Sequence, residues 1–341
     1  MQEDRRVSST ARPKVAFIGT GGTISSLGVH SLELQDYVIH DRRMHASEIV
    51  ARFPVVDEIA EIIPVDFRNV PSPEIYYAEW RELAALCHRL AAEHPDLAGI
   101  VVGHGTATLE ETAWFLNLVL KVPVPVVVIG AQRPASGLST DAAINLVNGV
   151  RVAADPASRG RGVLVLLNDE IQAAREVTKT SNWRMQTFRT PDFGVLGHAD
   201  ADRIAYYRRP ERRHMPDTEF DVAAVEALPR VDIAYAYAGS DGSAMRAFMS
   251  AGAKGLVSAG FAPGMAPAAD LAAMKEAVQQ GIAVVQCSRA GSGRIFRGKR
   301  LAEAGILAAD NLNPQKARIL LALALTRTSD PVEIARIFAT Y

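Results

Sequence analysis

Length, composition and charge indicate a two-domain globular protein and argue against several function classes. The chain has 341 residues, of which 48% are hydrophobic and 22% are charged, enough for two domains with sizeable cores. Its 37 basic and 38 acidic residues give a formal net charge of −1, so no overall field favours nucleic acid or a membrane surface. No apolar run reaches the length of a transmembrane helix.

The cysteines and the N-terminal segment bear on the cellular compartment. Cys87 and Cys287 lie far apart and belong to no Cys-x-x-Cys pair, which argues against a zinc site or a disulfide framework. Residues 1–14 are polar and charged, without the apolar segment of a secretory signal. We therefore expect a cytoplasmic protein, or a periplasmic one if a signal has been removed.

Strands and helices are predicted to alternate along the chain, after a flexible tail at 1–13. Short β-branched runs predict buried strands, and apolar residues three or four positions apart predict amphipathic helices. The predicted strands span 14–19, 61–67, 99–102, 126–130, 162–167, 231–237, 255–259 and 282–286. The predicted helices span 46–52, 74–93, 140–154, 243–251, 268–280, 314–326 and 330–339, with one more that starts near 109. Residues 27–43 predict a mobile loop, and residues 168–200 predict a polar, loop-rich segment.

This alternation predicts an α/β protein with two parallel-sheet domains. We expect a larger N-terminal domain at 14–203, a linker at 204–229 and a smaller C-terminal domain at 230–341. Arginine and proline are frequent at 201–221, which favours a solvated linker over the alternative of a basic binding patch.

Two glycine-containing turns follow predicted strands, at 19–23 and 103–106. Such turns let backbone N–H groups converge on an oxyanion, and the carboxyl ends of parallel strands hold ligand sites in open α/β sheets. Thr108 and Glu111 have the spacing of a capping box, which predicts a helix start near 109. Thr23 and Thr106 are therefore predicted to present hydroxyls at one edge of the sheet.

A threonine hydroxyl needs a base before it can act as a nucleophile. Lys179 is a candidate base if burial lowers its pKa, and Tyr37 could serve the other threonine. Each residue also has an ordinary interpretation: either threonine as a cap or turn former, Lys179 as a solvated side chain and His104 as a hydrogen-bonded turn residue. The sequence contains no Ser-His-Asp order, P-loop, dinucleotide fingerprint or His-Glu-x-x-His motif.

In combination, five segments resemble the bacterial L-asparaginase/glutaminase family. They are Thr-Gly-Gly-Thr-Ile at 20–24, His-Gly-Thr-Ala-Thr-Leu-Glu-Glu-Thr-Ala at 104–113, Arg133-Pro134 with Asp141, Val-Thr-Lys-Thr at 177–180 and Asn-Pro-Gln-Lys-Ala-Arg at 313–318. The resemblance covers nearly the whole chain. It implies a two-domain asparaginase-like fold and a homotetramer of close dimers. It also implies active sites between the N-terminal domain of one subunit and the C-terminal domain of its neighbour.

The resemblance further implies hydrolysis of a side-chain carboxamide through an acyl-threonine intermediate, without metal or cofactor. Matched residue by residue, Thr23 falls on the nucleophile, and Tyr37, in a loop of different length, on the activating tyrosine. Thr106 and Lys179 fall on the second threonine and its lysine, and Ser72 on the serine that holds the substrate's α-carboxylate. The backbone N–H groups expected to face the oxyanion belong to Gly21, Gly22, Gly105 and Thr106.

The sequence departs from the family pattern where the substrate's α-ammonium would bind. Ala107 occupies the position of an aspartate that holds the lysine and the ammonium, and Pro73 that of a glutamine or glutamate. The family's C-terminal domain contributes an asparagine and an acidic residue to the neighbouring subunit's site. Gly239 aligns with the asparagine, and the position of the acidic residue falls within the basic stretch 294–300. Glu176, three residues before Lys179, is predicted to replace the missing aspartate.

These departures lead to three hypotheses. Because an unpaired buried ammonium is costly, the first is an amidohydrolase whose substrate lacks the α-ammonium: a carboxamide, imide or lactam, acidic if the arginines of 294–300 reach the site. The alternative is an ordinary L-asparaginase or glutaminase that binds its ammonium through other groups. The third, a non-catalytic small-ligand-binding member, conflicts with the presence of Thr23, Thr106 and Lys179.

Overall fold

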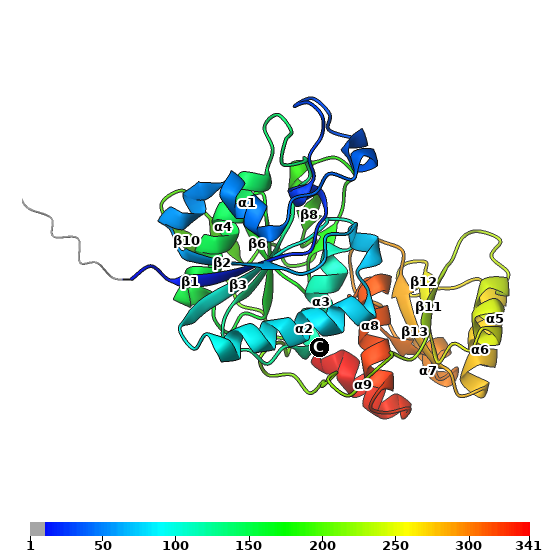
Figure 1. Ribbon diagram of the computed structural model, residues 1–341. Coiled ribbons are helices and arrows are strands. Elements are labelled where there is room, and N and C mark those ends of the chain that lie inside the picture. Colours follow the sequence, from blue (N-terminus) through cyan, green and yellow to red (C-terminus); the bar gives the residue numbers. More distant parts are fainter. Residues whose placement is uncertain (1–10) are drawn as a thin grey trace, which may run out of the picture.

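The computed structural model describes residues 11–341, which contain a large and a small sheet, each packed against helices (Figure 1). Residues 1–10 of the expected tail lie outside the described residues. The rest of that tail is attached to the protein, since the Arg12 guanidinium donates to the Asp57 carbonyl and the Pro13 carbonyl accepts from the Glu61 N–H at 2.9 Å.

The large sheet has the strand order β10-β9-β6-β5-β4-β3-β1-β2. Its strands are β1 (Lys14–Gly19), β2 (Glu61–Asp66), β3 (Leu97–Gly103), β4 (Val126–Ile129), β5 (Val163–Leu167), β6 (Glu170–Ala173), β9 (Gly197–Ala199) and β10 (Ile204–Tyr206). The neighbours from β2 to β5 run parallel, and β6, β9 and β10 continue the sheet antiparallel. The carboxyl ends of β1, β2 and β3 therefore meet at one edge of the sheet.

Helices cover both faces of the large sheet because successive strand residues point to opposite faces. Val15 and Phe17 pack in the cluster that includes residues of α1 and α4, whereas Ala16 and Ile18 pack in the cluster that includes residues of α2 and α3. These helices are α1 (Ala46–Arg52), α2 (Tyr77–Glu93), α3 (Leu109–Val119) and α4 (Ala142–Ala154). The result is a sheet with helices on both faces, consistent with the predicted α/β fold.

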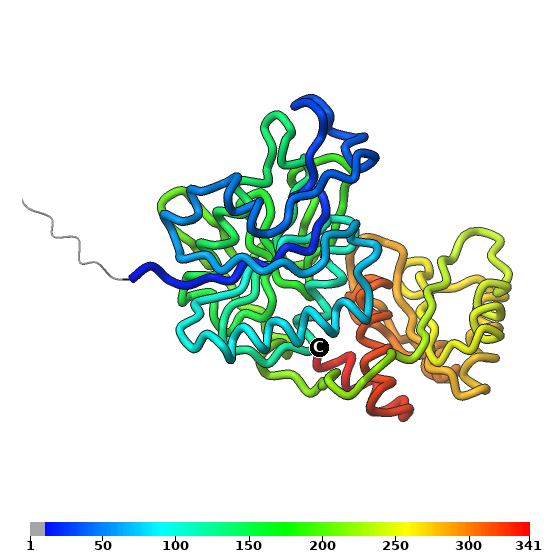
Figure 2. The backbone as a smooth tube through the Cα atoms, viewed as in Figure 1, coloured from blue at the N-terminus to red at the C-terminus, as the bar shows by residue number. Residues whose placement is uncertain are grey.

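The small sheet consists of four parallel strands, β11 (Val231–Tyr235), β12 (Gly255–Gly260), β13 (Ala283–Ser288) and β14 (Leu307–Ala308). Its helices are α5 (Ser243–Ser250), α6 (Ala268–Gln279), α7 (Lys299–Glu303), α8 (Pro314–Leu325) and α9 (Pro331–Thr340). Residues of α8 share one apolar cluster with α3 and with β12 and β13. The tube view shows this orange-red helix between the two parts of the molecule (Figure 2).

Two local predictions differ from the structure. The segment 168–200 contains four short strands, among them β7 (Thr178–Lys179) and β8 (Phe188–Arg189), which pair as a ribbon of their own. Strands of two to four residues carry no periodic pattern, so their pairing depends on contacts with distant segments. The capping box is also wrong: α3 begins at Leu109, but the Thr108 hydroxyl donates to the Ser72 carbonyl at 2.8 Å.

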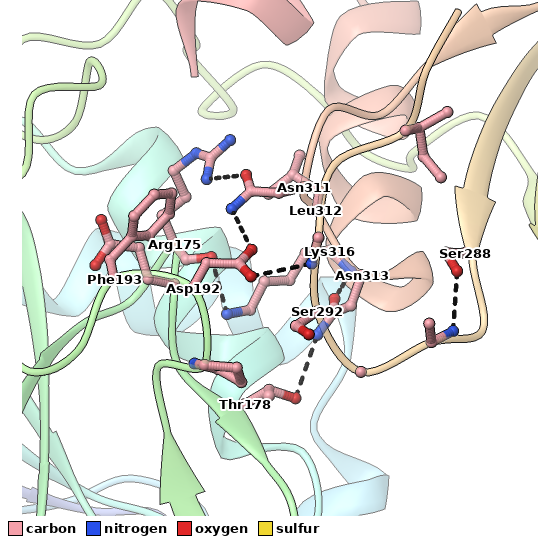
Figure 3. Close-up of a pocket in the computed structure, with 16 residues that line it drawn as sticks. Arg175, Thr178, Asp192, Phe193, Ser288, Ser292, Asn311, Leu312, Asn313 and Lys316 are labelled. Atoms are coloured by element: carbon pink, nitrogen blue, oxygen red, sulfur yellow. Dashed lines mark hydrogen bonds between the residues drawn. The ribbon is translucent and has the colours of Figure 1, made fainter. Parts of the chain in front are cut away.

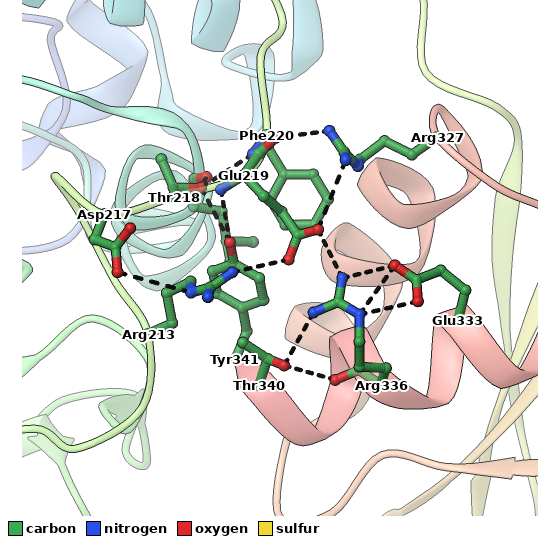
Figure 4. A network of polar contacts seen from close by, with 11 residues as sticks. Arg213, Asp217, Thr218, Glu219, Phe220, Arg327, Glu333, Arg336, Thr340 and Tyr341 are labelled. Atoms are coloured by element: carbon green, nitrogen blue, oxygen red, sulfur yellow. Dashed lines mark hydrogen bonds and ion pairs between the residues drawn. The ribbon is translucent and has the colours of Figure 1, made fainter.

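The arginine-rich connecting segment, expected to be a linker at 204–229, begins within β10 and is fastened to the C-terminal helix (Figure 4). The Glu219 carboxylate accepts from Arg213 at 3.3 Å and from Arg336 of α9 at 2.7 Å, and its backbone N–H donates to the Tyr341 hydroxyl at 2.8 Å. These contacts attach the segment that connects the two sheets to the C-terminal helix, α9.

Candidate active site

The turn after β1 is shaped by two glycines in left-handed conformations. Gly21 and Gly22 have φ angles of 103° and 81°, a region that residues with a Cβ rarely adopt. A Cβ on Gly21 would lie 2.4 Å from the Val70 carbonyl oxygen, so the turn packs tightly against the loop after β2. The hydroxyls of Ser25 and Ser26 donate to the Gly22 carbonyl at 2.8 and 2.9 Å and hold the turn in shape.

The turn after β3 packs directly against the first turn. A Cβ on Gly22 would lie 2.2 Å from the Cα of Gly105, so the two backbones touch. A Cβ on Gly105 would in turn lie 2.9 Å from the hydroxyl of Ser72, which follows β2 and is 3% exposed. The strand order thus brings the predicted residues Gly22, Ser72 and Gly105 together, as expected for the ends of neighbouring parallel strands.

Each of the two predicted threonines has a polar partner from a distant segment. The Thr23 hydroxyl lies 2.9 Å from the Tyr37 hydroxyl, which a 3₁₀ turn at Asp36–His40 presents. The Thr106 hydroxyl accepts a hydrogen bond from the Lys179 Nζ at 2.8 Å. The structure therefore brings together the residues that the sequence proposes as two nucleophile–base pairs.

The surroundings shift the pKa values of Lys179 and Tyr37. Burial lowers the pKa of Lys179, and the Glu110 carboxylate partly opposes this by raising it. Burial raises the pKa of Tyr37, the hydrogen bond with Thr23 lowers it and the Asp141 carboxylate raises it further. A lysine with a lowered pKa is more readily a neutral base, and a tyrosine with a raised pKa remains a phenol that can relay a proton.

Glu110, which is not among the site residues predicted from the sequence, is a buried carboxylate that fixes the strand carrying Lys179. One carboxylate oxygen accepts from the Lys179 N–H and the Thr178 hydroxyl, each at 3.2 Å, and the other accepts from the Asn313 side chain at 3.1 Å. Glu110 is 6% exposed on a helix whose other residues are almost all buried. An acidic residue inside such an apolar helix is the one signal by which the sequence could have indicated it.

Lys316, at the start of α8, extends its side chain toward the segment that leads to Thr178 and Lys179 (Figure 3). Its Nζ donates to the Ala174 and Arg175 carbonyls at 2.8 and 3.1 Å and to the Val177 carbonyl, and lies 3.9 Å from Glu110. Burial lowers the pKa of Lys316 to about 8. Through Lys316, the 313–318 segment of the C-terminal domain therefore binds the residues that lead to Lys179 in the N-terminal domain.

Comparisons with known proteins identify the family. The model of the N-terminal asparaginase domain matches residues 14–212, and that of the glutaminase/asparaginase C-terminal domain matches residues 230–338. The chain belongs to the asparaginase family. As the sequence predicts, it is thus a hydrolase of the family that acts on amide C–N bonds.

Several members of the asparaginase family match nearly the whole chain. L-asparaginase 2 of Escherichia coli is 38% identical over 98% of this chain and 95% of its own length. Glutaminase-asparaginase of Pseudomonas fluorescens is 36% identical over 98% and 92%. The probable periplasmic L-asparaginase of Haemophilus influenzae is 38% identical over 96% and 93%. The crystal structure of a probable cytoplasmic L-asparaginase from Campylobacter jejuni, 35% identical, superposes with a TM-score of 0.92 over 97% of this chain and all of that one.

The asparaginase-family chain described here lacks a charge at two predicted ammonium-binding positions. Pro73 and Ala107 are both exposed, next to the buried Ser72 and Thr106. In the C-terminal domain, Gly239 lies in a turn with a φ of 90°, and in the 294–300 segment Arg297 donates to the Ile306 carbonyl at 3.0 Å. A proline ring and a methyl group therefore occupy the positions where the family resemblance implies a glutamine or glutamate, at 73, and an aspartate, at 107.

Two further expectations can be compared with the structure. The prediction that Glu176 replaces the missing aspartate is wrong, because its carboxylate pairs with Arg208 on the connecting segment. His104 is a buried, hydrogen-bonded residue, which agrees with its ordinary interpretation. Its Nδ1–H donates to the Gly105 carbonyl at 2.8 Å, its Nε2 accepts from Thr112 at 2.9 Å, and burial lowers its pKa to about 4.

The described residues can also be compared with the expectations on metals and membranes. Over 11–341, no three His, Cys, Asp or Glu side chains gather as possible metal ligands. In the same part of the chain, no helix is both long and apolar enough to cross a bilayer. Cys87 and Cys287 are both buried as free thiols.

Proposed function

We propose that this protein hydrolyses the amide group of a small molecule through an ester with Thr23. The observation that carries the proposal is that the Thr23 hydroxyl pairs with the Tyr37 hydroxyl and the Thr106 hydroxyl with the Lys179 amine, while the two threonines adjoin glycines whose backbones touch. Two hydroxyls on adjacent turns can flank one carbonyl group. The N–H groups of the glycine turns are suited to stabilise the oxyanion that forms there.

In the proposed reaction the Thr23 oxygen forms a bond to the amide carbon while Tyr37 accepts its proton and passes its own toward the leaving nitrogen. The C–N bond then breaks and ammonia leaves. A water molecule adds to the resulting ester, its proton passes through Thr106 to Lys179, and the carboxylate product leaves Thr23 free. A neutral Lys179 can accept this proton, and its lowered pKa supports that role.

The relatives favour L-asparagine or L-glutamine as the substrate. The proteins from Escherichia coli and Pseudomonas fluorescens are named for asparagine or for both amides, and each matches nearly the full chain. Ser72, buried beside Gly105, is available for the α-carboxylate of such a substrate. In this first candidate, groups other than those at positions 73 and 107 bind the α-ammonium.

The residues at two positions support a second candidate, an amide without an α-ammonium. Ala107 and Pro73 offer no charge and no side-chain acceptor at the positions that the family pattern assigns to the ammonium. A cationic group bound there without partners would lose affinity by orders of magnitude. The substrate in this case is a deamino carboxamide such as succinamate, or a cyclic imide or lactam.

An amide panel assayed for ammonia or carboxylate release tests the proposal and separates its two forms. It contains L-asparagine, L-glutamine, succinamate and a cyclic imide, with Thr23→Ala as the inactive reference. High kcat/KM for asparagine without succinamate turnover contradicts the second candidate, and the reverse pattern contradicts the first. No turnover of any amide by the folded protein would contradict the proposed function itself.

Restoring the polar residues that the family resemblance implies at positions 73 and 107 adds a second test to the amide panel. If the substrate lacks an ammonium, Ala107→Asp combined with Pro73→Gln is expected to raise kcat/KM for asparagine at least about tenfold, because the ammonium gains paired acceptors. Ala157→Asp adds the same charge at an exposed position in the 3₁₀ turn Pro156–Ser158 and serves as the control. An unchanged preference in the double variant would show that these positions do not select the substrate.

We also propose the homotetramer that the family resemblance implies. Three aromatic side chains of the C-terminal domain, Tyr235, Tyr237 and Phe296, are 62%, 58% and 65% exposed and could be covered by another subunit. Light scattering on the purified protein measures the assembly, and a monomeric mass at micromolar concentration would contradict the proposal.

A further inference from the structure

Gln132, which is not among the site residues predicted from the sequence, contacts both members of the Thr106–Lys179 pair. Its side-chain oxygen accepts from the Lys179 Nζ and from the Thr106 hydroxyl, each at 3.4 Å. These two contacts are long for hydrogen bonds, but they converge on one oxygen. Together with the 2.8 Å bond from Lys179 to Thr106, they close a triangle of polar atoms around the lysine amine.

The amide of Gln132 has one orientation that fits its surroundings. Its Nε2 donates to the Arg184 carbonyl at 3.4 Å, so the oxygen faces the lysine. The reverse orientation would direct N–H groups at the Lys179 amine and place the amide oxygen against the Arg184 carbonyl oxygen. The neighbouring groups therefore present an oxygen acceptor, and no donor, to Lys179.

The loop that carries Gln132 is fixed by the half-buried carboxylate of Asp141, at the start of α4. The Asp141 carboxylate accepts from the Gln132 N–H at 2.9 Å and from the Arg133 N–H at 2.9 Å. The Asn145 side chain donates to Asp141 at 3.1 Å and to the Gly130 carbonyl at 2.9 Å. Because these bonds hold the backbone on both sides, the Gln132 side chain starts from a defined position next to Thr106.

We propose that Gln132 is a positioning residue that holds the Lys179 amine against Thr106 through a neutral oxygen, next to the uncharged Ala107. The inference rests on the proposed function of the Thr106–Lys179 pair and deepens it. A carboxylate in the same place would stabilise the charged ammonium, whereas an amide oxygen orients the amine without adding an opposite charge. The site thereby keeps a positioned lysine that can lose its proton.

Other charged side chains near Lys179 lie on the elements that pack against its strand, β7. Glu110 of α3 binds the backbone N–H of Lys179. Asp141 and Arg133 lie on the loop of Gln132, where they are bound to backbone groups, and Arg189 lies on the paired strand β8 and donates to the Gln186 carbonyl. A charge introduced at position 132 would be added to this set at the Lys179 Nζ itself.

Two substitutions that nearly preserve the size of the Gln132 side chain distinguish the effect of an added charge from the effect of losing the acceptor. Gln132→Glu is expected to raise the pKa of Lys179 by about 1 to 3, because an opposite charge then lies within hydrogen-bond reach of the amine. The rising limb of the kcat–pH profile should move to higher pH by the same amount. Gln132→Met removes the acceptor without adding charge, and kcat should fall about tenfold or more with little change in KM and no upward shift of the limb.

The control is Gln186→Glu, which adds the same charge at an exposed glutamine on the neighbouring 3₁₀ turn. The pKa of Lys179 is measured by NMR on protein labelled with ¹³C at the lysine ε-carbons. The chain has seven lysines, so Lys179→Arg assigns the signal. This readout needs no substrate and is taken on the full chain, with Tm recorded for each variant.

The outcomes distinguish this inference from the proposed function. A pKa of Lys179 that rises in Gln132→Glu and not in Gln186→Glu supports the inference, even if no amide of the panel is hydrolysed. Equal pKa shifts in both variants overturn it, whether or not amides are hydrolysed. Should Gln132→Glu fail to fold, a Gln132→Met variant with unchanged kcat and unchanged lysine pKa overturns it as well.

Discussion

Replacing Gly22 by alanine tests whether the contact between the two turns positions the reactive hydroxyls. The new Cβ would lie 2.2 Å from the Cα and 2.5 Å from the N of Gly105. Carbon atoms in contact need about 3.5 to 4 Å, so the two turns must separate by about 1 Å or more. Thr23 directly follows one turn and Thr106 the other, so the separation moves their hydroxyls apart.

The expected magnitudes follow from this geometry. The φ of 81° with a ψ of −170° lies in a region nearly restricted to glycine and costs a residue with a Cβ about 1 to 3 kcal/mol, and forcing the backbones apart costs about 1 to 3 kcal/mol more. At about 0.7 kcal/mol per degree for a chain of this length, the loss lowers Tm by roughly 3 to 9 °C. A misplacement of about 1 Å should reduce kcat/KM about 100-fold.

Gly160→Ala is the matched control for Gly22→Ala. Gly160 has a φ of 66°, also in the left-handed region, but a Cβ there would have no atom within 4 Å. It should therefore show the backbone strain without the clash, and keep its amidase activity. Calorimetry gives the two Tm values and ammonia release gives kcat/KM. If Gly22→Ala loses no more than Gly160→Ala in both measurements, the turns do not position the hydroxyls by their contact.

Two further predictions concern buried polar groups next to the site. Glu110→Gln leaves the buried Lys316 without its carboxylate and should destabilise the protein by about 3 to 5 kcal/mol. The control Glu111→Gln, one position along the same helix, should change stability by less than about 1 kcal/mol. Equal losses of Tm in the two variants would refute this prediction. The pKa of His104 is lowered to about 4 when folded, so its contribution to stability should be complete above pH 6.5 and be lost as the pH falls from 6.5 to 4. His104→Gln should show a flatter Tm profile over that range, and an equally steep profile would contradict the assignment.

The sequence predicts the regular elements well because their signals are local. The strand 14–19 and the helix 46–52 have the predicted bounds, and both sheets have the predicted parallel core. Burial on both faces makes a parallel strand an unbroken apolar run, which the residues alone reveal. The short antiparallel strands of 168–200 lack such a run, so the sequence suggests a loop where the structure has a ribbon carrying Lys179.

The sequence predicts those residues of the candidate site that a local motif indicates. Thr23 and Thr106 are indicated by the glycine turns in front of them. The identity of the groups around Lys179 depends on contacts between residues far apart in the chain. Glu176 is nearest in sequence but pairs with Arg208, whereas Glu110 is 69 positions away and binds the lysine backbone. Along an irregular segment, the number of residues between two positions does not determine where their side chains point. The prediction that Glu176 binds Lys179 is therefore wrong.

The two reactive pairs differ in what holds them in place. Thr23 and Thr106 follow adjacent strands of one sheet, so the fold of the N-terminal domain is sufficient to bring them together. Lys179 lies on β7, outside that sheet, and its position depends on Glu110 and on contacts that Asn313 and Lys316 make from the C-terminal domain. Because the lysine is the proposed proton acceptor, the chemistry depends on both domains being joined, even though both hydroxyls belong to one of them. This dependence gives the 313–318 segment a physical reason to be polar where α8 enters the core.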